Sequence, residues 1–474
     1  MRYALLAARP DAVFTAAFDI NPNACEVYEH NFGDRVTRKN LASVPHSALD
    51  ALGATLWLMS PPCQPFTRQG AVKDLRDGRA ESFLRLVDAL GALENPPTDV
   101  LVENVVGFET SEMRGVMLDA FDDAGFATEE FVLTPRQFGV PYSRPRYFCL
   151  ATKADERRAA GDARAAETTE PRAWPLDRVR RAPPPSPLSD PARWVPGAGA
   201  ADLAPCVPRE VAPREPRRPG ETHLEEAKRR AAAEAGGREE ETRGDLLYDA
   251  LGNETPERGR SVPAEYSADA SVCRVATLAH FLEDGGGGGS DGGGGSDGGI
   301  GSDGGVRSDG SIGSDGGIGS SGRPDLFATH GVPRAEVLKA MRSVDVRSSS
   351  DRKCNCFTKS YGKYVKGTGS FVGDRGDGPI SKGTWEAAYE RDGGGGGGEG
   401  GFPSPPGPGP GGVSAIRLRY FTEREVANVH SFPASFAFPE TTTRAQRYAL
   451  LGNSLSVACV APLVDYLLTR AGGF

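Results

Sequence analysis

The chain has 474 residues, of which 25% are charged, and its formal net charge is −9. This acidic balance argues against a protein that binds nucleic acid strongly and without specificity. No signal peptide, transit peptide or membrane-spanning stretch is apparent in the sequence. We therefore expect a protein of the cytoplasm, and also of the nucleus, with no membrane partner.

Ala16 to Asp19 is the first strand pattern, and it ends in an acid. In dinucleotide-type folds such an acid holds ribose hydroxyls, about 20 residues after a glycine-rich turn. That turn would have to lie at or before Met1, and Leu5 and Leu6 would remain from the helix that follows it. Two interpretations stay open: a start codon assigned too far downstream, which we favour, or a chain defective in cofactor binding.

The most distinctive stretch is Ser-Pro-Pro-Cys-Gln-Pro-Phe-Thr at residues 60–67, directly after an apolar run at 55–59 that predicts a short buried strand. The two prolines fix φ and remove backbone donors, so the chain must leave the sheet there. Cys63 is then held on a stiff loop past a strand's carboxyl end, where open α/β sheets bind ligands. Taken alone, a nucleophilic cysteine and an inert buried one are equal alternatives.

Two later stretches favour the nucleophile. Residues 99–102 are another buried-strand pattern, which leads into Glu103. If the two strands are parallel neighbours, Glu103 and Cys63 face one cleft. Arg144 and Arg146 precede a third strand and, as alternate residues, could share a face. The plainer alternatives are a surface glutamate that caps the next helix and a solvated pair of arginines.

A thiol, a carboxyl group and paired guanidinium groups suit the methylation of cytosine at carbon 5. Carbon 5 does not react with methyl donors, but a thiolate that adds at carbon 6 makes it nucleophilic. A carboxyl group on ring nitrogen 3 takes up the charge that this addition creates. Arginines can hold the ring carbonyl, and nearby cations lower the pKa of a cysteine.

With these motifs in this order, the chain resembles the cytosine-5 methyltransferases. Residues 446–455 resemble the family's last motif, and residues 420–425 and 430–433 resemble the motif before it. The tRNA-aspartate branch of the family matches best, because Cys-Phe-Thr at 356–358 and the Tyr/Gly pattern after it are typical of that branch. The resemblance covers residues 1–153, 325–372 and 415–470.

The resemblance implies a class I (Rossmann-like) S-adenosylmethionine-dependent methyltransferase: an α/β, doubly wound, mostly parallel sheet with a small target-recognition lobe and disordered insertions. Glycine-rich tracts form no core, and residues 154–220 are expected to be largely disordered. The expected parts are an N-terminally truncated catalytic domain (1–153), an Ala/Arg/Pro-rich insertion (154–270), the lobe (271–392) interrupted by a Gly/Ser/Asp linker (284–322), a Gly/Pro linker (393–414) and a return to the catalytic domain (415–474).

The resemblance also implies S-adenosyl-L-methionine as cofactor and assigns site residues. The catalytic residues are Cys63, Glu103, Arg144 and Arg146, and the cofactor residues are Asp19, Asn40, Leu41, Ser60, Asn453 and Ser454. Without the glycine loop, we expect the 474-residue chain to bind the cofactor weakly or not at all and to be poorly soluble. Adding the missing strand and loop from the upstream reading frame should restore binding.

The segment from Arg352 to Lys366 carries five cations and no acids, with Phe357, Tyr361 and Tyr364 between them. Cations pair with phosphates and aromatic rings stack splayed bases, which is how RNA loops are usually recognised; a solvated strand is the alternative. The expected substrate-binding residues are Cys356, Thr358, Lys359, Lys363 and Lys366.

We therefore expect methylation of cytosine 38 in the anticodon loop of tRNA-aspartate, through a covalent adduct of Cys63. One alternative is a DNA cytosine-5 methyltransferase, which makes DNA a less favoured partner than tRNA. Another is a catalytically impaired RNA-binding relic, because the glycine loop is absent. The cysteines include no Cys-x-x-Cys pair and the six histidines are scattered, so we expect no metal site.

Overall fold

The computed structural model describes residues 1–62, 81–153, 174–197, 204–206, 273–283, 325–373 and 417–470. Cys63 and the predicted linkers at 284–322 and 393–414 lie outside these residues.

A central sheet of five strands has the order β1-β2-β4-β3-β5. β1 pairs parallel with β2, and β3 with β5, whereas β4 runs antiparallel to both of its neighbours. The other four strands therefore share one direction, in a mixed sheet that is consistent with the expected Rossmann-like fold. The strands are β1 (Leu56–Met59), β2 (Asp99–Val105), β3 (Phe126–Leu133), β4 (Arg146–Lys153) and β5 (Val179–Arg180).

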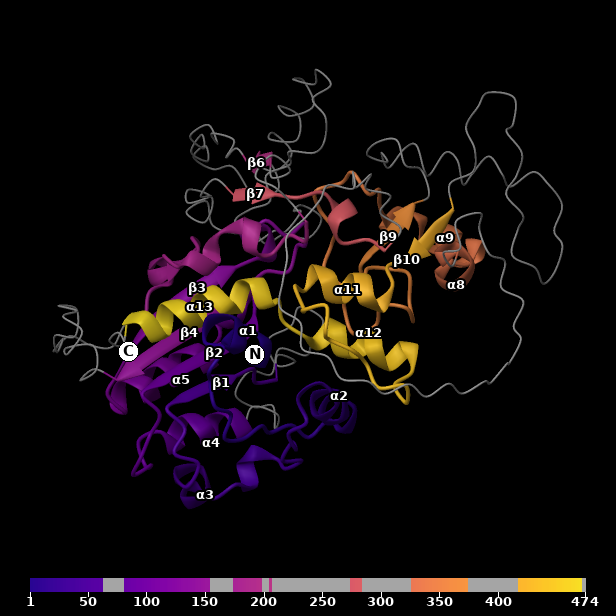
Figure 1. The fold of residues 1–474 in the computed structure, drawn as a ribbon. Helices are drawn as coiled ribbons and strands as arrows, with labels where there is room; N and C mark the ends of the chain where they lie inside the picture. Colours follow the sequence, from indigo (N-terminus) through magenta and orange to yellow (C-terminus); the bar gives the residue numbers. More distant parts are fainter. Residues whose placement is uncertain are drawn as a thin grey trace, which may run out of the picture.

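Helices cover both faces of this sheet, as a doubly wound fold requires (Figure 1). Alternate residues of β2 point to opposite faces. Val100 and Val102 share a buried cluster with α4 (Glu81–Ala89) and α5 (Glu112–Asp123). Leu101 joins the cluster that contains α1 (Arg2–Ala8) and α13 (Val457–Arg470). The helices α2 (Pro22–Phe32) and α3 (His46–Asp50) precede β1.

The strand expected over residues 16–19 is reduced in the structure to a single parallel bridge between Phe18 and Thr37. No second strand lies beside it among the described residues to extend the pairing, and β1 forms the edge of the described sheet. All four residues of β1 are only partly buried, although Leu-Trp-Leu-Met is an apolar run. The expectation of a buried strand here is therefore met only in part.

Residues 174–197 differ from the expected disordered insertion. β5 extends the central sheet beyond β3, and Val179, Leu188 and Val195 are buried. The Arg178 guanidinium also contacts the fully buried Glu130 carboxylate at 3.0 Å. The expectation of disorder was wrong for residues 174–197, because a few widely spaced apolar residues hold this segment on the sheet. Such residues hardly change the composition of a Pro-rich, charged stretch.

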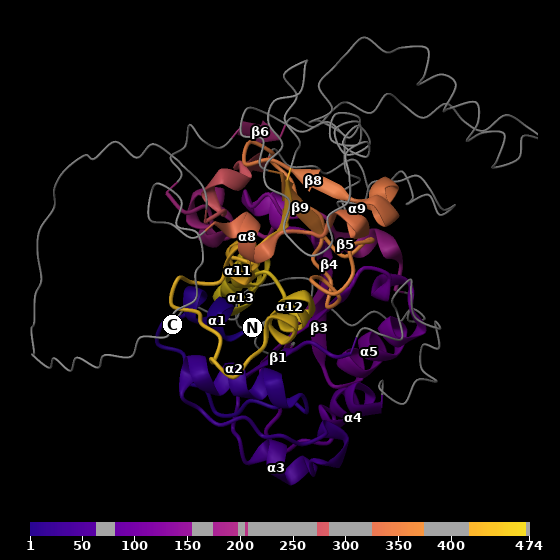
Figure 2. The same cartoon turned by 90° about the vertical axis from the view of Figure 1, so that its right-hand side faces the viewer.

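The target-recognition lobe contains a three-stranded sheet of order β10-β9-β8, formed by β8 (Asp345–Arg347), β9 (Ser370–Gly373) and β10 (Leu418–Tyr420). Figure 2 shows β8 and β9, with α8 (Leu326–His330) and α9 (Arg334–Ala340), above α11 (Glu423–Val429) and α12 (Arg444–Asn453). A two-stranded sheet joins β6 (Ala204–Cys206) to β7 (Cys273–Val275). The return to the catalytic domain was expected from residue 415, but β10 belongs to the lobe, and α13 is the element that packs on the central sheet.

The stretch Arg444–Arg470, which holds α12 and α13, is long and apolar enough to cross a membrane by composition, with a mean hydropathy of 1.4. However, 78% of the 18-residue segment with this hydropathy is buried inside the protein, as for a core helix.

Candidate active site

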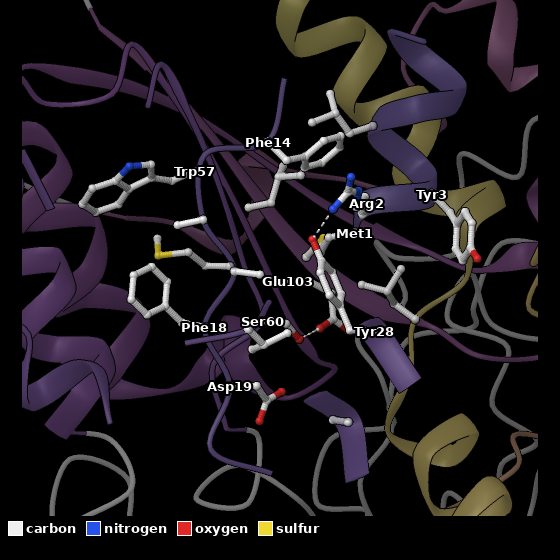
Figure 3. Close-up of a pocket in the computed structure, with 18 of the residues that line it drawn as sticks. Met1, Arg2, Tyr3, Phe14, Phe18, Asp19, Tyr28, Trp57, Ser60 and Glu103 are labelled. Atoms are coloured by element: carbon white, nitrogen blue, oxygen red, sulfur yellow. Dashed lines mark hydrogen bonds between the residues drawn. The ribbon is translucent and has the colours of Figure 1, made fainter. Parts of the chain in front are cut away.

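The reversed direction of β4 brings two of the predicted catalytic residues, Glu103 and Arg146, together at the carboxyl end of β2. Because β4 is antiparallel to β2, its first residue, Arg146, pairs with Val105 at the carboxyl end of β2. The Arg146 Nε lies 3.2 Å from the Glu103 Oε1. Ser60, which directly follows β1, donates its hydroxyl to the Glu103 Oε2 at 2.5 Å (Figure 3). Three strands thus each supply one residue to a single cluster.

Cys63 lies outside the described residues, but the loop that leads to it begins at this cluster. Ser60, Pro61 and Pro62 all line the same cavity as Glu103. The Glu103 side chain is 8% exposed, so its carboxylate is held away from bulk water between Ser60 and Arg146.

The cavity has a volume of about 1710 Å³. Figure 3 shows Asp19, Ser60 and Glu103 in the lining of this cavity, together with the rings of Phe18 and Trp57. Asp19 is exposed, and its Oδ1 accepts a hydrogen bond from the backbone nitrogen of Asn21, which caps α2. All six predicted cofactor residues line this one cavity: Asp19, Asn40, Leu41, Ser60, Asn453 and Ser454.

These residues fit S-adenosylmethionine in chemistry. Asp19 offers a carboxylate to ribose hydroxyls, and Phe18 and Trp57 offer apolar rings to an adenine. The volume, however, exceeds the ~300–1,000 Å³ of typical ligand pockets. Sequence reasoning missed Arg2, whose guanidinium lies 3.9 Å from the Phe14 ring centroid within the cavity lining. No local sequence pattern predicts this position of Arg2, because it depends on how α1 packs against the rest of the protein.

Arg144 does not join the Glu103 cluster, although it lines the same cavity. Its side chain is almost fully buried, and its Nη1 donates to the Cys356 sulfur at 3.1 Å and to the Phe357 carbonyl at 3.2 Å. Its Nη2 donates to the Gly452 carbonyl at 2.9 Å and to the Ser454 carbonyl. We expected Arg144 and Arg146 to project together to one side, but the protein itself engages both Nη1 and Nη2 of Arg144.

Cys356 differs from the other described cysteines. Burial opposes ionisation of its thiol, but Arg144 and Arg146 together hold its pKa below the usual value. Burial raises the pKa of Cys354, two residues earlier, well above the usual range. The sequence cannot distinguish the two thiols, since both lie in the same Cys-Asn-Cys stretch.

The predicted RNA-binding segment is exposed only in part. Lys359, Lys363 and Lys366 are exposed, and Tyr364 is 56% exposed with the Lys363 ammonium 5.3 Å from its ring centroid. Phe357 and Tyr361 were expected to be available for base stacking, but both are buried in the core. They pack edge to face with a centroid distance of 4.7 Å, so their aromatic character serves the lobe interior. Lys353 is also buried, and burial, followed by the Arg136 charge, lowers its pKa to about 7.

Thr358 lies where the lobe meets α12. Its backbone nitrogen donates to the Thr368 carbonyl at 2.9 Å. A Cβ added at Gly452 would lie 2.3 Å from the Lys359 nitrogen and from the Thr358 carbonyl carbon. Only glycine therefore lets α12 approach this loop so closely.

The family model described as C-5 cytosine-specific DNA methylase matches residues 1–181 and 349–467. The chain is 30% identical over 473 residues to a tRNA (cytosine(38)-C(5))-methyltransferase of Mus musculus, which covers 100% of this chain and 91% of the relative. It is 24% identical over 472 residues to a DNA (cytosine-5)-methyltransferase of Dictyostelium discoideum, with 99% and 91% covered. The crystal structure of the S. pombe Dnmt2 methyltransferase has the same fold, with a TM-score of 0.56 at 22% identity over 99% of this chain and 95% of that chain. The chain therefore belongs to the C-5 cytosine-specific methylase family and, within it, groups with the tRNA (cytosine(38)-C(5))-methyltransferases.

Proposed function

We propose that this protein methylates carbon 5 of cytosine in the anticodon loop of tRNA, at cytosine 38 of tRNA-aspartate, with S-adenosylmethionine as methyl donor. The observation that carries the proposal is the Glu103 carboxylate, held by Arg146 and Ser60 on the wall of the cavity that the predicted cofactor residues line. The full-length similarity to enzymes named for tRNA cytosine 38 supports the choice of substrate.

In the proposed mechanism the Cys63 thiolate adds to carbon 6 of the cytosine, and the electrons of the 5,6 double bond pass to carbon 5. The protonated form of the Glu103 carboxyl group donates a hydrogen bond or its proton to ring nitrogen 3, which stabilises the negative charge of the adduct. Arg146 holds the ring carbonyl and fixes the Glu103 carboxyl group. The cytosine must leave its stack to reach these groups, which costs little in a single-stranded loop.

S-adenosylmethionine supplies an electrophilic methyl group when bound. Asp19 would hold its ribose, Asn40 and Leu41 would flank its adenine, and Ser60, Asn453 and Ser454 would complete the pocket.

A parallel assay on tRNA and on duplex DNA tests the substrate. We expect methyl transfer to tRNA-aspartate, its loss when cytosine 38 is replaced by uridine, and far less transfer to duplex DNA. The reverse preference would favour the DNA methyltransferase alternative, which the relative from Dictyostelium discoideum keeps in view. RNA binding without transfer to either substrate would favour the relic alternative.

Replacing Lys359, Lys363 and Lys366 by alanine should weaken tRNA binding, because all three are exposed around Tyr364. Each lost phosphate contact should reduce the slope of log K against log salt by about 0.7–0.9. Binding measured between low and moderate salt gives this slope. Lys339→Ala is a matched control, since its side chain is 71% exposed in the same lobe. An unchanged slope in the triple variant would show that the cluster is only a solvated face.

Calorimetry should show weak binding of S-adenosylmethionine to the 474-residue chain, so the parallel assay on tRNA and DNA needs a high concentration of the methyl donor. The cavity of about 1710 Å³ is larger than the ligand can fill, so part of the ligand surface would stay in water. Asp19→Asn should remove any residual binding if this carboxylate holds the ribose. A micromolar Kd for the unmodified chain would contradict the expectation.

A further inference from the structure

His430 belongs to a buried series of hydrogen-bonded side chains that the proposed reaction does not use. It follows the last residue of α11, and its ring is fully buried. The His430 Nδ1 lies 2.7 Å from the Val426 carbonyl oxygen, which can only accept, so Nδ1 carries the proton. Burial and the nearby Arg144 charge hold the pKa of His430 well below its usual range, so the ring is neutral. The His430 Nε2 is therefore a fixed hydrogen-bond acceptor.

The Tyr142 hydroxyl is the donor to that acceptor. It lies 3.2 Å from the His430 Nε2, and the two rings are in contact with centroids 4.8 Å apart. Once its proton is committed to His430, the Tyr142 oxygen accepts from others. The Phe357 backbone nitrogen donates to it at 3.3 Å, and the Arg144 Nη1 does so at 3.5 Å. One histidine thus orients the lone pairs that face Arg144.

Arg144 joins three separate parts of the chain. It follows the segment in which Tyr142 forms a parallel bridge with Cys354 of the lobe. It also contacts the Cys356 sulfur and the carbonyls of Gly452 and Ser454, at the end of α12. Ser454 lines the cofactor cavity, so the guanidinium links the lobe to the wall of that cavity.

We infer that His430, acting through the Tyr142 hydroxyl, is a positioning residue: it fixes Arg144, and Arg144 in turn fixes the Cys356 sulfur and the 452–454 turn of the cofactor cavity. The consequence for catalysis rests on the proposed function. The contacts from His430 to Cys356 do not depend on that function, and they can be tested without any methyl transfer.

Alkylation of Cys356 by iodoacetamide reports on Arg144 directly. The sulfur forms a bond to carbon and iodide leaves, and only the thiolate reacts. The charged or titratable groups that act on this thiol are Arg144, Arg146 and the Tyr142 hydroxyl. Mass spectrometry of peptides from the full chain, sampled over time at several pH values, gives the rate at Cys356 and at Cys354 as an internal reference.

Tyr142→Phe keeps the ring that stacks on Phe357 with centroids 5.6 Å apart, but it removes the hydroxyl. We expect alkylation of Cys356 at pH 7 to slow by about threefold to tenfold, since one unit of thiol pKa is tenfold in thiolate at pH values below it. His430→Leu should act in the same direction. His430→Gln, which keeps an acceptor within reach of the Tyr142 hydroxyl, should restore most of the rate.

Tyr147→Phe is the matched control. It also removes a fully buried hydroxyl, which donates to Glu130 at 2.6 Å, but its ring belongs to the buried cluster of α4 and α5 and not to the cluster that contains Tyr142. We expect Tyr147→Phe to lower Tm about as much as Tyr142→Phe does, but to leave the rate of Cys356 alkylation unchanged. In the active enzyme, Tyr142→Phe should also raise the KM for the methyl donor with little change in tRNA affinity.

Two outcomes would overturn the inference. One is an unchanged Cys356 rate in His430→Leu, whatever the effect of Tyr142→Phe. The other is an equal slowing in Tyr147→Phe, which would indicate general loosening of the fold. A protein that shows the expected alkylation pattern but methylates no tRNA would contradict the proposed function and leave the positioning role intact.

Discussion

Replacement of Cys63 by alanine is expected to reduce methyl transfer to the uncatalysed background, even at high methyl-donor concentration. Without the thiolate, carbon 5 of the cytosine never becomes nucleophilic. The same change should abolish the covalent adduct with RNA that carries 5-fluorocytosine at the target position. Denaturing gel electrophoresis shows that adduct as a band of reduced mobility.

Cys149→Ala serves as the control for loss of a thiol. Cys149 is fully buried in β4, and burial raises the pKa of its thiol far above the usual range, so it cannot act as a nucleophile. This variant should keep both turnover and adduct formation, apart from a modest loss of stability. Substantial turnover by Cys63→Ala would remove the basis of the proposed covalent mechanism.

Glu103→Gln is expected to lower the single-turnover rate by about 10²–10⁴, the usual contribution of general acid assistance. Glutamine keeps the shape of the side chain and can still meet Ser60, but it carries no carboxyl proton for ring nitrogen 3. The Arg146 guanidinium, 3.2 Å away, also loses its charged partner. tRNA affinity should change far less than the rate.

The neighbouring Glu109 gives the matched control. It is similarly buried, and its Oε2 accepts from the Gly107 nitrogen at 2.7 Å rather than facing the cavity. Glu109→Gln should affect stability without a comparable loss of rate. If Glu103→Gln weakened RNA binding and left the single-turnover rate unchanged, the acid role would be wrong.

Local sequence signals placed several site residues correctly at strand ends. Two prolines after an apolar run mark where β1 stops, and Glu103 lies near the end of β2. Both signals are encoded within a few residues, because proline fixes φ and a buried strand needs an apolar run. Composition was less informative for residues 174–197, where single buried side chains separated by polar residues hold the segment on the sheet.

The sequence by itself determined the chemical groups of this protein: a cysteine, a carboxylate and two arginines beside strands, and a set of polar residues that one cavity collects. Only the tertiary structure decided which of them meet. The antiparallel direction of β4 brings Arg146 to Glu103. The contacts of Arg144 with Cys356 and of Tyr142 with His430 join residues that are roughly 200 to 300 positions apart in the sequence. Strand direction and side-chain partners depend on packing between distant segments, which no local pattern encodes.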